Sequence, residues 1–254
     1  MAWNGKLFGV PVISKKACVR MAIGVSALAI GCGWLYYRGV MMPGSSYHGE
    51  FAALDAQETE LATNLERHVT VLAGDIRQRN ALYITGLERA RDYIEAELTS
   101  YGYTDLERQT YAIDGSQMYT NDASFRGAMD GVEVWNVAAE LRGQTRPEEI
   151  LVIGAHYDSV DECPAANDNG SGVAATLELA RMLHGKRLDR TVRFVFFTNE
   201  EPPYFQTSNM GSYQYAWHCQ QRGDQVVGML SLETMAYYVD DPRSQKYPSP
   251  LDKF

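Results

Sequence analysis

The chain has 254 residues, of which 45% are hydrophobic and 22% charged, and this is enough to build one large folded domain or two small ones. Its formal net charge is −9 and no block of Lys and Arg interrupts the sequence, so the composition argues against a nucleic-acid-binding protein. The four cysteines form no CxxC pair, which argues against a thiolate zinc knuckle.

The first predicted element is an apolar helix close to the N-terminus. Residues 21–37 carry no charge, and weakly apolar residues extend the run to about residue 41. Three basic residues precede the run (Lys15, Lys16 and Arg20), whereas only Arg38 follows it directly. Basic residues stay on the cytoplasmic side, so we expect residues 1–20 in the cytoplasm and a single-pass transmembrane signal anchor at residues 21–41.

Two other interpretations of the apolar run are a cleaved signal peptide and a lipoprotein signal ending at Cys32. No clear A-x-A cleavage site follows the run, and an aromatic apolar stretch continues past Cys32, so we favour an uncleaved anchor. Turn-forming residues at 42–50 predict a linker, and residues 51–254 then form the domain outside the cytoplasm. In that compartment Cys163 and Cys219 form one disulfide or stay as two buried thiols, and the sequence leaves both open.

The remaining chain predicts strands that alternate with helices. Helical periodicity covers residues 51–72 and 85–101, and two strands follow at 106–113 and 132–141, separated by a polar loop. Short apolar runs predict further strands at 150–155, 191–198 and 226–232, with helices at 171–185 and 210–223 between them. This order is typical of an α/β layer fold.

Three of these predicted strands end in side chains that bind metals or protons. The strand at 150–155 is followed by His156, the strand at 191–198 by Glu200 and Glu201, and the strand at 226–232 by Glu233. Asp168 lies in the loop after the first of these strands, just before a helix. Ligands of open α/β sheets bind beyond the carboxyl ends of the strands, so these side chains are expected at one edge.

Carboxylates gathered at one edge repel one another unless a cation lies among them. One or two divalent cations would remove this repulsion, and a set of imidazole and carboxylate ligands suits zinc. Adjacent glutamates on a regular strand point to opposite faces, so Glu200 and Glu201 can share a site only if the chain leaves the sheet there. Pro202 and Pro203 follow directly and favour such an exit.

The stretches GAHYDSV, ANDNGSGVAATLELAR, RTVRFVFFTNEE and LSLET, in this order, resemble the zinc aminopeptidase family M28, which also contains glutaminyl cyclases. The resemblance runs from about Leu65 to Tyr238. It implies a three-layer fold in which helices flank a mixed sheet, a site for two zinc ions, and a cis peptide bond between Asp168 and Asn169.

The resemblance also implies a role for each matching residue. His156 and Glu233 would bind one zinc ion, Glu201 would bind the other, and Asp168 would bridge the two. Glu200 would be the general base, and Asp158 would hold the ring of His156 in place.

Two positions depart from the family pattern. Glu233 stands where the family usually has Asp. The family also has a further His ligand well downstream of that position, whereas the last residues of this chain, up to Phe254, contain no His. We therefore expect the C-terminal part of the domain to be missing and the chain to be a poorly active fragment.

The sequence thus predicts a membrane-anchored zinc aminopeptidase that acts on peptide or protein N-termini, with its catalytic domain on the periplasmic or extracellular side. The alternatives are a glutaminyl cyclase-type acyltransferase and a non-catalytic binding protein on the same fold. The sequence does not indicate the oligomeric state.

Overall fold

The structure is a computed structural model that describes residues 6–7, 10–11, 14–39, 41 and 49–237. It contains two compact units, Met1–Ala53 and Leu54–Phe254. Most of the expected linker at 42–50, including His48, lies outside the described residues, as does the segment 238–254 that holds the last residues of the chain.

The first unit consists of a short strand pair and one long helix. Strands β1 (Lys6–Leu7) and β2 (Val10–Pro11) pair antiparallel, and α1 (Lys15–Gly39) follows. The 25 residues of α1 have a mean hydropathy of 1.7 in their most apolar window, and none is buried within the protein. At a rise of about 1.5 Å per residue, the helix is long enough to cross a bilayer, a property that signal sequences share. It begins earlier in the chain than the predicted span at 21–41.

The second unit is built on one five-stranded sheet, in the order β3-β4-β6-β5-β7. Its strands are β3 (Glu107–Ala112), β4 (Glu133–Leu141), β5 (Arg146–His156), β6 (Arg190–Phe197) and β7 (Gln225–Ser231). Strand β4 pairs antiparallel with β3 and with β6, whereas β5 pairs parallel with both β6 and β7. The predicted strands and the mixed character of the sheet are confirmed.

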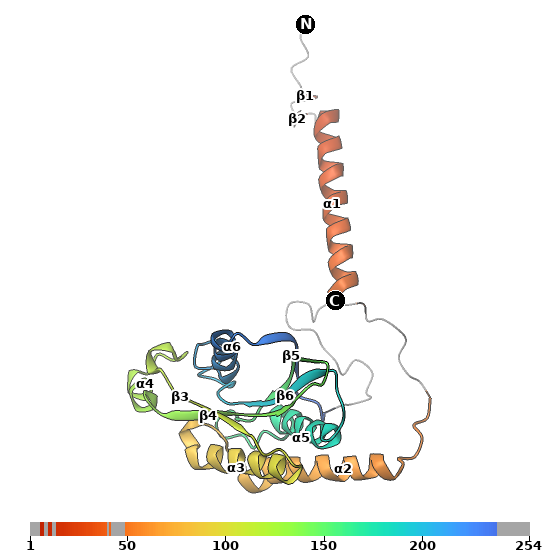
Figure 1. Ribbon diagram of the computed structural model, residues 1–254. Coiled ribbons are helices and arrows are strands. Elements are labelled where there is room, and N and C mark those ends of the chain that lie inside the picture. The colour runs from red at the N-terminus through yellow and green to blue at the C-terminus, as the bar shows by residue number, and fades with distance from the viewer. Residues whose placement is uncertain (1–5, 8–9, 12–13, 40, 42–48, 238–254) are drawn as a thin grey trace. The chain divides into compact units, whose positions relative to one another are not determined.

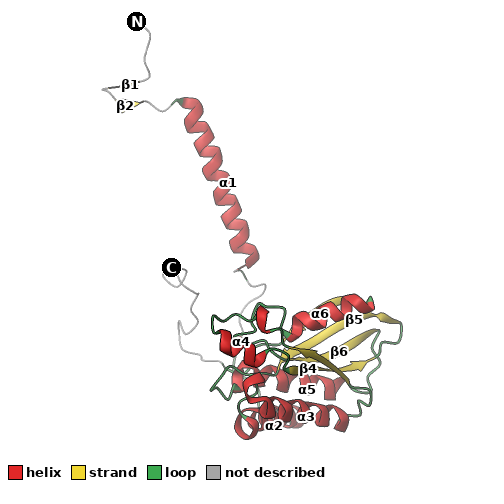
Figure 2. Cartoon of the chain, turned by 90° about the vertical axis from the view of Figure 1, so that its left-hand side faces the viewer, coloured by secondary structure: helices red, strands yellow, loops and turns green. Residues whose placement is uncertain are grey.

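Helices cover both faces of this sheet, so the fold has three layers (Figures 1 and 2). Helices α2 (Ala56–Val69), α3 (Ile84–Ser100) and α5 (Gly172–Leu183) lie on one face, and α6 (Gly211–Arg222) lies on the other. Successive residues of a strand point to opposite faces. Accordingly, Phe194 and Phe196 of β6 enter the core under α3 and α5, and Val195 and Phe197 enter a smaller core beneath α6.

The first predicted helix of this unit is shorter and less regular than the expected range of 51–72. It begins after Asp55 because this side chain accepts the Glu58 backbone N–H at 2.8 Å while Glu58 accepts the Asp55 N–H at 2.9 Å, a capping box. After α2 the chain continues as a π-helical segment, η1 (Thr70–Ile76), and a single 3₁₀ turn, η2 (Ala81–Tyr83), leads into α3.

The segment between β3 and β4, which we expected to be a loop, contains a 3₁₀ turn, η3 (Gly115–Gln117), and a short helix, α4 (Ala123–Met129). Asp122 begins α4 by accepting the backbone N–H groups of Ser124 and Phe125. Cys163 is half-buried and Cys219 is buried, and both are free thiols in the structure.

Candidate metal centre

The candidate site lies where three parallel strands end. His156 is the last residue of β5, Glu200 and Glu201 follow β6, and Glu233 follows β7. Because β6 and β7 both run parallel to β5, these ends meet at one edge of the sheet. Asp168 comes to the same place from the π-helical turn η4 (Ala166–Ser171), which leads into α5.

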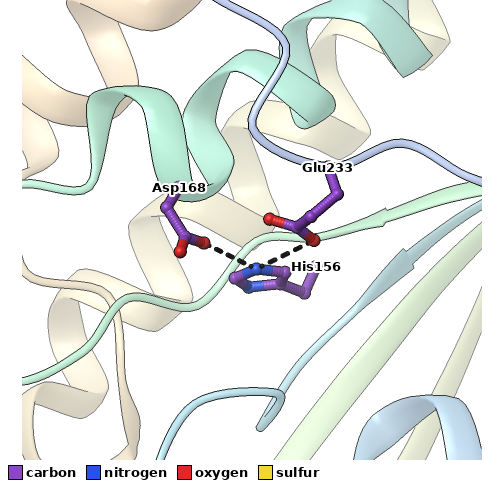
Figure 3. Close-up of side chains that lie close together, drawn as sticks. All are labelled: His156, Asp168 and Glu233. Atoms are coloured by element: carbon purple, nitrogen blue, oxygen red, sulfur yellow. Dashed lines mark hydrogen bonds and ion pairs between the residues drawn. The ribbon is translucent and has the colours of Figure 1, made fainter. Parts of the chain in front are cut away.

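One group of potential ligands surrounds the imidazole of His156 (Figure 3). His156 Nε2 lies 3.1 Å from Asp168 Oδ1 and 3.5 Å from Glu233 Oε2. The ring is only 3% exposed, whereas the side chains of Asp168 and Glu233 are 56% and 46% exposed. A buried nitrogen therefore faces two carboxylates that are open to solvent, which is a geometry that can hold a cation.

The two glutamates after β6 form a second group with the same imidazole. His156 Nε2 lies 3.8 Å from Glu200 Oε2, and ligand atoms of His156, Glu200 and Glu201 lie within 4.8 Å of one another. Both glutamates are half-buried. Asn199, which precedes them, has a φ of 55° and turns the chain out of the sheet direction, so that adjacent residues approach one site.

Asp158 contacts the site in a different way from that expected. Its Oδ1 lies 3.3 Å from His156 Nδ1, but this nitrogen makes no hydrogen bond of adequate geometry, so the contact is electrostatic. The hydrogen bonds of the carboxylate go to the next strand end, because Oδ1 accepts the Glu200 backbone N–H and Oδ2 accepts the Glu201 N–H, each at 3.1 Å. Asp158 therefore joins the end of β5 to the turn after β6.

The protonation of the site reflects an excess of negative charge. Burial opposes the charged form of His156, but Asp158 and Glu233 outweigh this effect and raise the pKa of His156 to about 11. Burial, together with Asp158 and Asp168, raises the pKa of Glu201 to about 7. Burial also raises the pKa values of Asp168 and Glu200, and nearby carboxylates add to the effect. Without a metal, protons on these side chains reduce the repulsion between the carboxylates, and a bound cation would do the same in their place. The nitrogen and oxygen ligand atoms of the site fit zinc.

Two residues that the sequence did not single out hold the ligand segments together. Asn169 Nδ2 donates to Leu232 O at 2.8 Å and to Glu233 Oε2 at 3.1 Å, and its Oδ1 accepts the Gly172 N–H at 3.0 Å. Ser171 Oγ accepts the Met235 N–H at 2.8 Å. The start of α5 is therefore tied to the chain after β7, and the polar turn NDNGSG was the signal for this role. The Asp168–Asn169 peptide bond is cis, as expected.

Comparisons with known proteins agree with the resemblance in the sequence. Residues 136–251 match the model of peptidase family M28. The chain is 34% identical over 194 residues to an uncharacterized protein of Escherichia coli, YfbL, covering 73% of this chain and 53% of that protein. It is 29% identical over 206 residues to a probable zinc metalloprotease of Leptosphaeria maculans, covering 76% of this chain and 45% of that protein. The chain thus spans about half the length of the curated relatives it matches.

The fold also matches solved structures. The aminopeptidase from Aneurinibacillus sp. strain AM-1 aligns with a TM-score of 0.52 at 20% identity, over 68% of this chain and 70% of that chain. At this identity the likeness concerns the fold, and it confirms the expected mixed sheet with flanking helices.

Proposed function

The chain belongs to peptidase family M28, and on that premise we propose that it is a zinc-dependent aminopeptidase that releases residues from peptide N-termini. One observation carries the proposal: three parallel strands end at one edge and gather a buried imidazole and several carboxylates around a common space. Such a set is poorly stable without a cation and well suited to bind one.

We propose that His156 and Glu233 hold one zinc ion, that Glu201 holds a second, and that Asp168 lies between them. The distances from His156 Nε2 to Asp168 and Glu233 support the first set, and the grouping of Glu201 with His156 and Glu200 supports its place in the same centre. Zinc bound there would supply a Lewis acid that polarises a peptide carbonyl and acidifies water.

Glu200 is the proposed general base. Its side chain is 30% exposed and its Oε2 lies 3.8 Å from His156 Nε2, so it is close to the proposed ligands and open to a substrate. Burial and the neighbouring carboxylates raise its pKa, which brings its proton affinity closer to that needed for exchange near neutral pH. The hydrogen bond from its backbone N–H to Asp158 holds it in position. Glu200 would accept a proton from water and deliver it to the leaving amine.

The membrane location is a proposal of the same kind. Helix α1 has the length and composition of a span, and three basic residues, Lys15, Lys16 and Arg20, lie in its N-terminal turns, whereas Arg38 alone lies near its other end. This supports an anchor in the cell membrane with the second unit on the periplasmic or extracellular side.

Adjacent glutamates offer a matched test of the assignment. We expect Glu200→Gln in the full chain, purified in detergent, to keep its zinc content but to lose hydrolysis of aminoacyl p-nitroanilides by roughly 10²–10⁴-fold, because it removes a base and not a ligand. Glu201→Gln should lose zinc. If Glu200→Gln lost zinc and Glu201→Gln kept it, Glu200 would be the ligand and Glu201 the base. Pyroglutamate formation from an N-terminal Gln peptide, without hydrolysis by the wild-type chain, would replace the aminopeptidase with a glutaminyl cyclase.

A further inference from the structure

The largest fully buried side chain of the described residues belongs to Arg79, which lies between η1 and η2. Its hydrogen bonds within the described part of the chain do not include a carboxylate. The guanidinium donates to five backbone carbonyl oxygens at 2.7–3.1 Å, those of Leu72, Arg77, Tyr157, Pro164 and Ala165. A buried cation that is bound only by carbonyls costs free energy, so its contacts need an explanation.

Three of these five carbonyls belong to the two segments that carry the proposed ligands. Arg79 Nε donates to Tyr157 O at 2.9 Å, and Tyr157 lies between His156 and Asp158. Its Nη atoms donate to Pro164 O at 2.8 Å and Ala165 O at 3.1 Å, directly before the turn η4 that contains Asp168. One guanidinium thus connects the end of β5 to the loop that returns to the metal centre.

The main chain of Arg79 reinforces this connection. Its backbone N–H donates to Ser159 Oγ at 2.9 Å, and its carbonyl accepts the Ser159 N–H at 2.8 Å. The remaining guanidinium bonds reach Leu72 and Arg77 in and beside η1. The residues after β5 are therefore held on one side by η1 and on the other by the loop before Asp168.

Only arginine has the shape for this set of contacts. Its planar guanidinium presents five N–H donors in a fixed fork, whereas lysine presents three donors from one nitrogen on a flexible stem. Burial lowers the pKa of Arg79 to about 10, with Asp158 acting against this effect, so the group still carries its charge at neutral pH. The protein therefore keeps a buried charge whose hydrogen bonds span both ligand segments.

We infer that Arg79 is a positioning residue of the metal centre, which sets the separation between the segment of His156 and the segment of Asp168. The inference rests on the proposed zinc site, and it predicts that the loss of the guanidinium fork weakens zinc binding more than it weakens the fold.

The test compares Arg79→Lys with Arg91→Lys in the full chain in detergent. Arg91 is also buried, but its guanidinium lies 4.3 Å from the centre of the Trp135 ring and donates to Asp92, and none of its hydrogen bonds among the described residues reaches the residues after β5 or the loop before Asp168. Zinc affinity is measured by competition with a chromogenic chelator, and the stability of the zinc-free protein by urea unfolding. We expect Arg79→Lys to bind zinc roughly tenfold to hundredfold more weakly than wild type. We expect Arg91→Lys to stay within about threefold, as sites without shared partners do.

Cobalt substitution adds a readout of ligand geometry, because the visible absorption bands of bound Co²⁺ should change in Arg79→Lys and not in Arg91→Lys. Unchanged zinc affinity in a folded Arg79→Lys protein would overturn the inference while leaving the zinc site intact. A wild-type chain that binds no zinc would overturn both. If Arg79→Lys does not fold, Ser159→Ala decides: weaker zinc binding supports the connection through Arg79, and wild-type affinity rejects it.

Discussion

Asp158→Asn is a sharp perturbation of the candidate metal centre because it changes one buried carboxylate into an amide of the same shape. The Asp158 side chain is 1% exposed, and each of its oxygens accepts one backbone N–H, from Glu200 and from Glu201. The amide keeps one oxygen and replaces the other with an NH₂ group, which must face a backbone N–H donor.

The size of the effect follows from these two hydrogen bonds. One backbone N–H loses its acceptor and stays buried, which costs about 1–3 kcal/mol, and the other loses the charge of its acceptor, which costs about 1 kcal/mol more. We therefore expect the free energy of unfolding of the zinc-free protein to fall by roughly 2–4 kcal/mol. Zinc affinity should fall by about tenfold to hundredfold, since the turn that carries Glu200 and Glu201 is then held by one uncharged hydrogen bond in place of two charged ones.

Urea unfolding followed by tryptophan fluorescence measures the first effect, and chelator competition measures the second. Asp105→Asn is the control, because it makes the same chemical change at an exposed position and should alter stability by less than about 0.5 kcal/mol. If Asp158→Asn unfolded at the wild-type urea concentration and bound zinc normally, the two N–H contacts would not be what organises this turn.

Two further predictions concern proton release and membrane attachment. His156 has a pKa of about 11 in the zinc-free site, so at pH 7–9 zinc must displace its proton, and zinc affinity should rise about tenfold per pH unit. Calorimetry in buffers of different ionisation enthalpy should detect this proton, and His156→Ala should abolish its release. Zinc binding without proton uptake by the buffer would contradict the protonated state assigned to His156. Full-length protein should remain in the membrane fraction after alkaline carbonate washing, whereas a chain begun at Ser45 should be soluble, and release of the full-length protein by the wash would refute the anchor.

The parts of the fold that could be predicted from sequence are those in which a periodic apolar pattern decides the structure. Strand β6 alternates its side chains between two buried faces, and α3 repeats a stripe of buried residues that includes Leu87, Ile94 and Leu98. Since His156, Glu200 and Glu233 each follow such a strand, the gathering of these side chains at one edge was also predictable.

The remaining features depend on contacts between distant residues. Helix α4 is short and lies in a segment rich in Gly, Asp and Ser, so only the cap at Asp122 could have indicated it. Arg79 stands in the polar stretch IRQRN, which is typical of a solvated surface. Its burial depends on carbonyl groups about 80 residues away, near Tyr157 and Ala165, and no local pattern reports such contacts.

Asn199 limits how this protein can change during evolution. Its φ of 55° costs most residues about 1–2 kcal/mol, costs glycine little, and is adopted by Asn and Asp more often than by other residues. A descendant that keeps two consecutive glutamates directed at one centre must also keep this backbone. We therefore expect only Asn, Asp and Gly to replace one another at position 199 without loss of stability. Selection should remove β-branched residues there, even in related proteins that act on different substrates.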